Sequence, residues 1–226
     1  MRGVMSVRIG IIGDSLGANF AGPGYAAYLD EILTRRGWNV EIDNRSQAGA
    51  ASDYGPSAAR ALVSGADKPD IVVLELGGND LKVQLSPSFI RQNLANTIEI
   101  LQEHNVTVVL SGAIAPSWAP SSYKQEFDQI YTGLAREYGV ILDPFILDSL
   151  VQNPEGRSLR EVFNQRYMAD EIHPNYLGAR LVAEDLADEI EQALRARSRS
   201  SEVGADESVQ LVASETRVTS FAAKTG

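Results

Sequence analysis

Short runs of apolar residues, many of them β-branched, alternate along the chain with longer segments that have helical periodicity. The apolar runs are continuous rather than alternating, which is typical of strands covered by helices on both faces of a sheet. The runs span residues 8–13, 40–44, 71–76, 106–111 and 140–143. This alternation predicts an α/β fold with three α/β/α layers, a five-stranded parallel sheet and right-handed crossovers.

The segments between the runs repeat apolar residues at three- and four-residue spacing, as amphipathic helices do. They cover residues 25–36, 56–64, 87–104, 122–138 and 175–196. The third segment begins with Ser86 and Pro87, a capping residue followed by a first-turn proline. Beyond residue 197 the periodicity fades into a stretch rich in Ser, Thr and Ala. We therefore predict one domain over residues 1–197 and a flexible C-terminal extension over 198–226.

The composition excludes several classes of function. The 226 residues carry a formal net charge of −10, so no basic face is available for nucleic acid and we expect none to bind. There are no cysteines, which excludes disulfides, thiolate nucleophiles and cysteine-ligated metal sites. The apolar runs are far shorter than the ~20 residues of a membrane-spanning helix, so we expect no stable membrane insertion. The run Ile9–Ile12 is too short for a secretory signal, which predicts a cytoplasmic protein unless the chain is a processed form.

The chemistry of the chain is concentrated where the predicted strands end. In an open parallel sheet, ligands bind beyond the C-terminal ends of the strands. Small and polar residues follow four of the strands and precede the last helix. These segments are Gly13–Gly17, Ser46–Gly49, Gly77–Asp80, Ser111–Gly112 and Asp170–His173. Five segments distant in sequence are therefore expected to meet at one edge of the sheet.

Ser15, His173 and Asp170 are the candidate catalytic residues. A serine hydroxyl is a poor nucleophile until a base takes its proton, and Ser15 is expected at a strand-to-helix corner where it can act as nucleophile. His173 is one of two histidines and precedes Pro174, which disfavours helical geometry and places this candidate base on a loop. Asp170, three residues earlier, can accept the other imidazole N–H and fix the tautomer. The pattern predicts a serine hydrolase with a Ser-His-Asp triad.

Acyl transfer also needs hydrogen-bond donors for the oxyanion that develops at the carbonyl. The candidates are the backbone N–H groups of Ser15 and Gly49 and the side-chain amide of Asn79. Glycine lets the backbone approach a substrate closely, and asparagine donates without adding a charge beside the histidine. The second histidine, His104, ends a predicted helix, where a cation suits the helix dipole, so we interpret it as structural.

Four segments of the chain resemble the sequence blocks of the SGNH hydrolase superfamily and occur in the same order. Gly13-Asp14-Ser15-Leu16 resembles the GDSL block, and Gly49 is similar to the glycine block. Gly78-Asn79-Asp80 resembles the asparagine block, and Asp170 with His173 is similar to the last block. The resemblance covers roughly residues 8–195 and points to the bacterial acyl-CoA thioesterase I, lysophospholipase and arylesterase branch.

This resemblance implies a flavodoxin-like fold with strand order 2-1-3-4-5. It implies hydrolysis of small-molecule carboxylic esters or thioesters through an acyl-serine intermediate, without metal or cofactor, and we expect small to medium acyl groups. Residues 111–123 resemble a mobile loop beside the acyl-chain groove of that branch. Pro116 and Trp118 in this loop are candidate substrate-binding residues; alternatively, they only stiffen the loop.

Several alternatives compete with this interpretation. Gly13-x-Ser15-x-Gly17 also fits the nucleophile elbow of α/β-hydrolases, but only one predicted strand precedes it. A nucleotide-binding module would need a dinucleotide or P-loop glycine pattern that the chain lacks. A non-catalytic small-molecule-binding relative need not keep Ser15 together with His173, whereas a carbohydrate acetyl-esterase would share the whole pattern. Asp170 could also simply cap the last helix, with His173 as a bystander.

Overall fold

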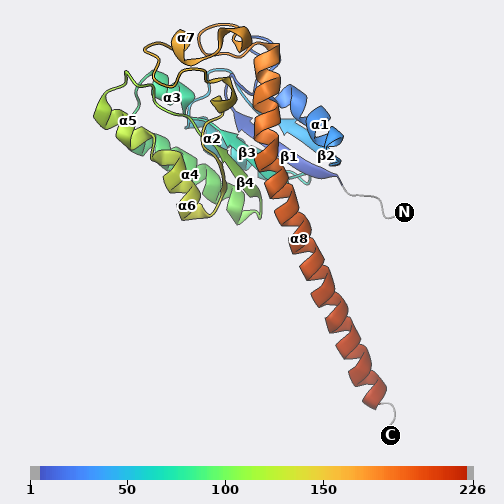
Figure 1. Cartoon of the computed structure of the whole chain (residues 1–226). Helices are drawn as coiled ribbons and strands as arrows, with labels where there is room; N and C mark the ends of the chain where they lie inside the picture. Colours follow the sequence, from blue (N-terminus) through green and yellow to red (C-terminus); the bar gives the residue numbers. More distant parts are fainter. Residues whose placement is uncertain (1–5, 223–226) are drawn as a thin grey trace.

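The computed structural model describes residues 6–222, with the side chains of residues 6–199, and contains a five-stranded sheet (Figure 1). The strands are β1 (Val7–Gly13), β2 (Val40–Asn44), β3 (Ile71–Glu75), β4 (Thr107–Ser111) and β5 (Ile141–Asp143). They lie in the order 2-1-3-4-5, and every neighbouring pair is parallel. The predicted α/β fold and strand order are confirmed, and each strand lies within one residue of the apolar run that predicted it.

The strand register puts four strand ends in one row across the sheet. Gly13 of β1 pairs with Glu75 of β3. Glu75 pairs in turn with Ser111 of β4, which pairs with Asp143 of β5. Because the strands are parallel, the loops that follow these residues leave the sheet along one line. This row holds two carboxyl groups and a hydroxyl, and the candidate site lies on the loops that leave this edge of the sheet after β1 and β3.

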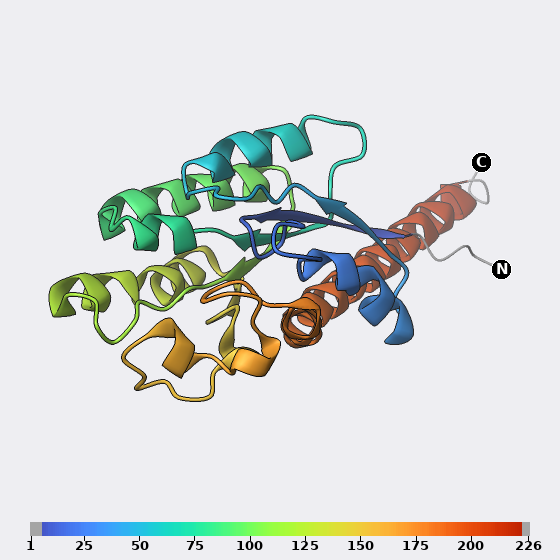
Figure 2. The same ribbon diagram turned by 90° about the horizontal axis from the view of Figure 1, so that it is seen from above.

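Helices cover both faces of the sheet (Figure 2). The longer helices are α1 (Ala26–Arg35), α2 (Tyr54–Val63), α4 (Pro87–Glu103), α6 (Ile130–Tyr138) and α8 (Tyr176–Ala222). Helices α1 and α8 pack with Ile9, Ile11 and Val73 on one face. Helices α2, α4 and α6 pack with Ile12 and Leu74 on the other. Neighbouring strand residues alternate between two buried clusters, which explains why the strands read as continuous apolar runs.

Shorter helical segments lie in the connections. They are α3 (Gly78–Lys82), α5 (Ser121–Phe127), η1 (Asp148–Leu150), α7 (Leu159–Val162) and η2 (Gln165–Tyr167). Helix α3 was not predicted, because five residues are too few to show a helical period; it starts after Gly77, whose φ of +115° favours glycine. The predicted cap of α4 is present, since the Ser86 hydroxyl accepts the N–H of Phe89 at 3.3 Å.

The helix predicted over residues 122–138 is interrupted. It forms α5 and α6, with a break at Asp128 and Gln129. The Asp128 carboxylate accepts the N–H of Ala115 at 2.9 Å, which ties this turn to the preceding loop. Phe127 and Ile130, on either side of the break, are buried in the same cluster. The apolar stripe therefore continues across the break, and periodicity alone could not reveal it.

The last helix is longer than predicted. The pattern predicted a helix over residues 175–196 and a flexible extension after it, whereas α8 continues as helix to Ala222 and projects beyond the rest of the molecule (Figure 1). A helix that is already nucleated can add residues without an apolar face, so a pattern that depends on burial misses this part. Residues 223–226 lie outside the described residues. The boundary between domain and extension at residue 197 stays a prediction.

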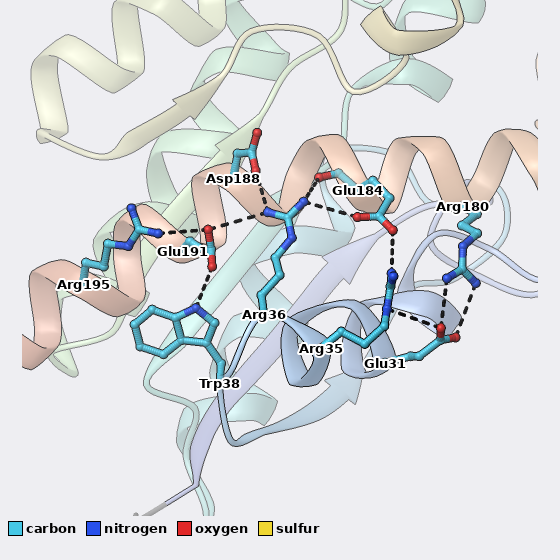
Figure 3. Close-up of polar contacts among 9 residues, drawn as sticks. All are labelled: Glu31, Arg35, Arg36, Trp38, Arg180, Glu184, Asp188, Glu191 and Arg195. Atoms are coloured by element: carbon cyan, nitrogen blue, oxygen red, sulfur yellow. Dashed lines mark hydrogen bonds and ion pairs between the residues drawn. The ribbon is translucent and has the colours of Figure 1, made fainter.

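Polar side chains fix α8 against α1 and the start of β2 (Figure 3). Arg36, just after α1, donates to Asp188 at 2.5 Å and to the backbone carbonyl of Glu184 at 2.9 Å. The indole N–H of Trp38 donates to Glu191 at 2.7 Å. An exposed ion pair such as that of Arg36 with Asp188 contributes only about 0–1 kcal/mol, and the three contacts together set the position of α8 against α1. That position matters because the loop that precedes α8 carries the candidate base.

Candidate active site

Three side chains from opposite ends of the chain meet at the edge where the strands end. The Oγ of Ser15 lies 3.0 Å from Nε2 of His173. The Nδ1 of His173 lies 2.7 Å from Oδ2 of Asp170. Ser15 follows β1, whereas the other two residues precede α8. The hydroxyl, imidazole and carboxylate therefore form one line of hydrogen bonds between residues 158 positions apart.

Asp170 both shapes the turn before α8 and contacts the imidazole. Its Oδ1 accepts the N–H of Ile172 at 2.9 Å and that of His173 at 2.8 Å, which leaves Oδ2 for the ring. Although burial raises the pKa of Asp170, the backbone donors and the His173 ring together lower it to about 2. The carboxylate is therefore ionised at neutral pH and placed to accept an imidazole N–H.

Asn175 caps the start of α8. Its side-chain oxygen accepts the N–H of Leu177 at 3.0 Å and that of Gly178 at 3.2 Å. Such an oxygen satisfies the free N–H groups that every helix start presents. The interpretation of Asp170 as the cap of the last helix is therefore wrong, and its carboxylate is available to His173.

The turn that carries Ser15 is built on buried polar groups. Gly13 has no room for a side chain, since a Cβ there would lie 2.8 Å from the Glu75 carboxyl group. The N–H of Asp14 donates to Glu75 Oε2 at 3.2 Å. The Oδ1 of Asp14 accepts the N–H of Leu16 at 2.9 Å. The backbone on both sides of the half-buried Ser15 is therefore held in place.

Glu75 and Asp14 are two buried carboxyl groups beneath this turn. Burial raises the pKa of Glu75 well above its usual range, and the neighbouring Asp14 adds to the rise. Burial also raises the pKa of Asp14, to about 6, against the lowering effect of the Leu16 N–H. Burial therefore favours the protonated form of Glu75, whereas Asp14, with a pKa of about 6, is mostly ionised at neutral pH. Sequence reasoning missed Glu75, although an acidic residue inside the apolar run 71–76 was a signal that could have revealed it.

The segments that carry Gly49 and Asn79 reach the same edge. Nδ2 of Asn79, in the first turn of α3, donates to Asp14 Oδ2 at 3.0 Å and to the carbonyl of Ala50 at 2.9 Å. Gly49 is exposed and has a φ of +80°, which favours glycine. Both N–H groups of the Asn79 amide are engaged within the protein. An oxyanion can therefore reach this amide only by displacing an acceptor or by sharing its hydrogen; the oxyanion role of Ser15, Gly49 and Asn79 stays a prediction.

Pro116 and Trp118 lie on the loop between β4 and α5, where Trp118 is 46 % exposed. The hydroxyl of Ser117 between them donates to a backbone carbonyl of a neighbouring loop at 3.0 Å. The aromatic ring that contacts His173 is that of Phe20, with ring centroids 5.1 Å apart. Sequence reasoning missed Phe20, because a single aromatic residue in a loop rich in Gly and Ala gives no periodic signal. A substrate-binding role for Pro116 and Trp118 stays a prediction.

Among the described residues, no group of three His, Asp or Glu side chains could hold a metal ion. None of the helices described combines the length and the apolar composition needed to cross a bilayer. The acidic residues around Ser15 instead accept the hydrogen bonds given above.

Comparison with known proteins decides the family. The model of the GDSL-like lipase/acylhydrolase family matches residues 11–181, which is most of the chain and includes Ser15, Asn79 and His173. The chain belongs to this family. The resemblance to the SGNH hydrolases is thereby confirmed, and the protein is a GDSL-type hydrolase of the esterase and thioesterase kind.

Relatives in the family cover nearly the same length. The chain is 28 % identical over 188 residues to the arylesterase of Vibrio mimicus, covering 82 % of this chain and 88 % of the relative. It is 27 % identical over 182 residues to thioesterase 1/protease 1/lysophospholipase L1 of Escherichia coli (strain K12), covering 80 % and 82 %. The crystal structure of AlinE4, an SGNH-hydrolase family esterase, has a TM-score of 0.65 at 33 % identity and covers 84 % of this chain and 97 % of that one.

Proposed function

We propose that this hydrolase cleaves carboxylic esters or thioesters with small to medium acyl groups, and that Ser15 carries the acyl group between the two halves of the reaction. The observation that carries the proposal is the 3.0 Å contact between the Ser15 hydroxyl and His173 Nε2. Proton transfer from a nucleophile to its base needs a contact of this length. The ionised Asp170 on the far side of the imidazole supports the same assignment.

In the first half of the reaction, Oγ of Ser15 attacks the acyl carbon while His173 Nε2 takes the hydroxyl proton. The carbonyl electrons move to the oxygen, which becomes the oxyanion. When the oxyanion collapses, the bond to the alcohol or thiol breaks, and His173 returns the proton to that leaving group. Asp170 accepts the Nδ1–H throughout and stabilises the imidazolium that forms.

In the second half, water takes the place of the leaving group. It attacks the acyl-serine and gives its proton to His173 Nε2. The second oxyanion collapses with release of the carboxylic acid, and the proton returns to Oγ of Ser15. Both oxyanions are proposed to lie against the N–H groups of Ser15 and Gly49 and the amide of Asn79. Loss of one such donor typically costs roughly 3–4 kcal/mol of transition-state stabilisation.

The substrate class rests on what the relatives' names share. They include an arylesterase and a thioesterase/lysophospholipase, which differ in the leaving group and have an acyl bond in common. We therefore assign the selectivity of this protein to the acyl side. Pro116 and Trp118, on the loop after β4, are proposed to contact the acyl chain, and the half-exposed indole offers it an apolar surface.

The first test removes the proposed nucleophile and base. Ser15→Ala and His173→Ala should each abolish turnover of p-nitrophenyl esters and of acyl-CoA, with little change in the thermal midpoint. His104→Ala is the matched control, since this exposed histidine lies at the end of α4 with its Nδ1 2.8 Å from the Ile100 carbonyl. Its turnover should equal that of the unaltered protein. Turnover that persists in Ser15→Ala would reject the assignment.

A second test separates an enzyme from a binding protein of the same fold. A fluorophosphonate probe should label the protein once, at Ser15, as read by peptide mass spectrometry, and His173→Ala should slow the labelling strongly. A panel of acyl-CoA, p-nitrophenyl esters of increasing chain length and acetylated sugars then measures kcat/KM. Highest activity on the acetylated sugars would move the protein to the carbohydrate acetyl-esterases.

A further inference from the structure

Asp14 connects the turn of the proposed nucleophile to the asparagine of the proposed oxyanion hole. Its Oδ1 accepts the N–H of Leu16 at 2.9 Å, next to Ser15. Its Oδ2 accepts an amide N–H of Asn79 at 3.0 Å. Asp14 is only 4 % exposed, so water does not compete for these bonds. The same carboxylate therefore holds both groups that must be in register for acyl transfer.

An asparagine side chain can point either end into a site, because its oxygen and its NH₂ group have nearly the same shape. At Asn79 the surroundings select one end. Asp14 Oδ2 and the Ala50 carbonyl are both acceptors, 3.0 and 2.9 Å from Nδ2. Only the NH₂ end fits between two acceptors, and only that end can stabilise an oxyanion.

We infer that Asp14 is a positioning residue that fixes which end of the Asn79 amide faces the nucleophile. An arriving oxyanion takes the N–H that Ala50 holds in the free protein, while Asp14 keeps the other. Ala50 is the partner that gives way, because a neutral carbonyl is a weaker acceptor than a carboxylate. The inference rests on the proposed function, since it gives Asn79 its role only if an acyl-transfer oxyanion forms beside Ser15.

Asp143 provides a matched carboxylate that lacks this role. It ends β5, whereas Asp14 directly follows β1; like Asp14, it is buried and accepts the N–H of the residue two positions later, here Phe145 at 3.1 Å. Its other oxygen accepts the hydroxyl of Ser111 at 2.5 Å. A hydroxyl can rotate and become an acceptor, whereas an NH₂ group cannot. The two aspartates therefore differ in how they tolerate an asparagine in their place.

Asp14→Asn presents one oxygen and one NH₂ group to two donors. If the oxygen keeps the Leu16 N–H, the new NH₂ opposes the NH₂ of Asn79. The Asn79 amide then loses its fixed orientation, because turning over relieves this conflict but sets the amide oxygen against the Ala50 carbonyl, 2.9 Å from the amide nitrogen in the unaltered protein. An amide that has turned over faces the nucleophile with its oxygen, which repels an oxyanion. We expect kcat to fall roughly 10²–10³-fold, as when one oxyanion donor is removed. In Asp143→Asn the Ser111 hydroxyl turns to accept, and kcat should stay near that of the unaltered protein.

Asp14→Ala removes the acceptor without adding a donor. The Asn79 amide keeps Ala50 as partner, and nothing forces it to turn. We therefore expect kcat to decrease in the order unaltered protein, Asp14→Ala, Asp14→Asn. A purely structural role predicts the reverse order of the two variants, because asparagine preserves the shape of the buried group and alanine does not. Thermal midpoints of both variants show whether each one folds.

The decisive experiment is a double-mutant cycle with Asn79→Ala, measured as kcat and KM on a p-nitrophenyl ester. Asp14→Asn should lower kcat in the native background, change KM much less, and have almost no further effect in the Asn79→Ala background. Equal effects in both backgrounds would overturn the inference, because Asp14 would then act independently of Asn79. If Asn79→Ala leaves kcat unchanged, the proposed oxyanion role of Asn79 is wrong. If Asn79→Ala lowers kcat but Asp14→Asn leaves it unchanged, the inference about Asp14 is wrong and the proposed function stands.

Discussion

Asp14 and Asp170 stand on the two sides of the site, and each accepts the N–H of the residue two positions later, from Leu16 at 2.9 Å and from Ile172 at 2.9 Å. Asp14 is 4 % exposed, whereas the side chain of Asp170 is 51 % exposed. Burial therefore dominates at the first residue and raises its pKa to about 6. At Asp170 the N–H donors and the imidazole outweigh burial and lower the pKa to about 2. The same local motif yields a titratable carboxyl group on one side and a permanent anion on the other.

This difference in burial and pKa indicates different roles for the two aspartates. On the base side, Asp170 holds the turn before α8 and the neighbouring imidazole, and solvent helps to keep its carboxylate charged. On the nucleophile side, the charge of Asp14 is buried with few donors, which is costly in an apolar environment. A neutral residue would suit stability better at that position. This is the pattern expected where a buried charge serves the chemistry of a site rather than the fold.

The largest effect is expected from a substitution that removes the acceptor of the imidazole N–H. Asp170→Asn replaces the Oδ2 acceptor, which lies 2.7 Å from His173 Nδ1, by a group that can present an NH₂ to the same nitrogen. The imidazole then loses the partner that fixes its tautomer, and kcat should fall on the order of 10³–10⁴-fold. Asp148→Asn, in η1 and outside the site, is a control that should leave kcat unchanged. A loss of less than about tenfold would show that Asp170 does not orient the base.

The pH profile sharpens the comparison. Below about pH 6 Asp14 gains a proton, and its carboxyl O–H then opposes the Asn79 NH₂ as an amide would. Protonation of His173 also lowers kcat, because an imidazolium cannot act as a base. Two protonations should therefore steepen the acid limb of log kcat in the unaltered protein. Asp170 does not add a step in this range, since its pKa of about 2 keeps it ionised, and burial favours the protonated form of Glu75.

The measurement is kcat at saturating p-nitrophenyl ester across this range, for the unaltered protein and for Asp14→Ala, each normalised to its own maximum. The variant lacks the Asp14 carboxyl group, so its acid limb should be shallower by one proton. At one pH unit below about 6 the two normalised curves should differ several-fold. Superimposable curves would show that the protonation state of Asp14 has no effect on catalysis.

The sheet and the meeting of Ser15, His173 and Asp170 followed from sequence, because both depend on local patterns. Continuous apolar runs mark strands covered on both faces, and parallel strands bring their following loops to one edge. The acceptors around Asn79 could not be derived in this way. Asp14 and Ala50 come from two other loops, and their contacts with the amide depend on how three turns pack together.

The other features that the sequence did not predict have related causes. The break between α5 and α6 is set by a contact of Asp128 with the preceding loop, and the sequence beyond residue 197 has no apolar periodicity that would predict the rest of α8. Phe20 is an isolated residue whose role is visible only beside His173. Glu75 interrupts an apolar run, and this anomaly could have been read from the sequence as a buried group with a special environment.

The smallest expected effect concerns stability and isolates the cost of the buried carboxyl groups. Because the folded-state pKa of Glu75 lies well above the ordinary value of 4.5, the folded protein holds a proton that the unfolded chain releases. The free energy of unfolding should therefore decrease as pH rises from 4.5 toward the folded-state pKa, by up to about 1.4 kcal/mol per pH unit.

Glu75→Gln removes this dependence, while its amide oxygen can still accept the Asp14 N–H. Its NH₂ group gains two candidate acceptors, since the buried hydroxyls of Tyr25 and Ser46 lack partners in the described structure and lie beside Gly13, as does Glu75 Oε2. The test is urea unfolding at pH 5 and pH 8. The free energy of unfolding of Glu75→Gln, relative to that of the unaltered protein, should be higher at pH 8 than at pH 5, with kcat little changed. The control is Glu126→Gln on the exposed surface of α5, which should show no such trend. A stability difference that is the same at both pH values would mean that Glu75 is ionised in the folded protein, and that burial does not govern the nucleophile side of the site.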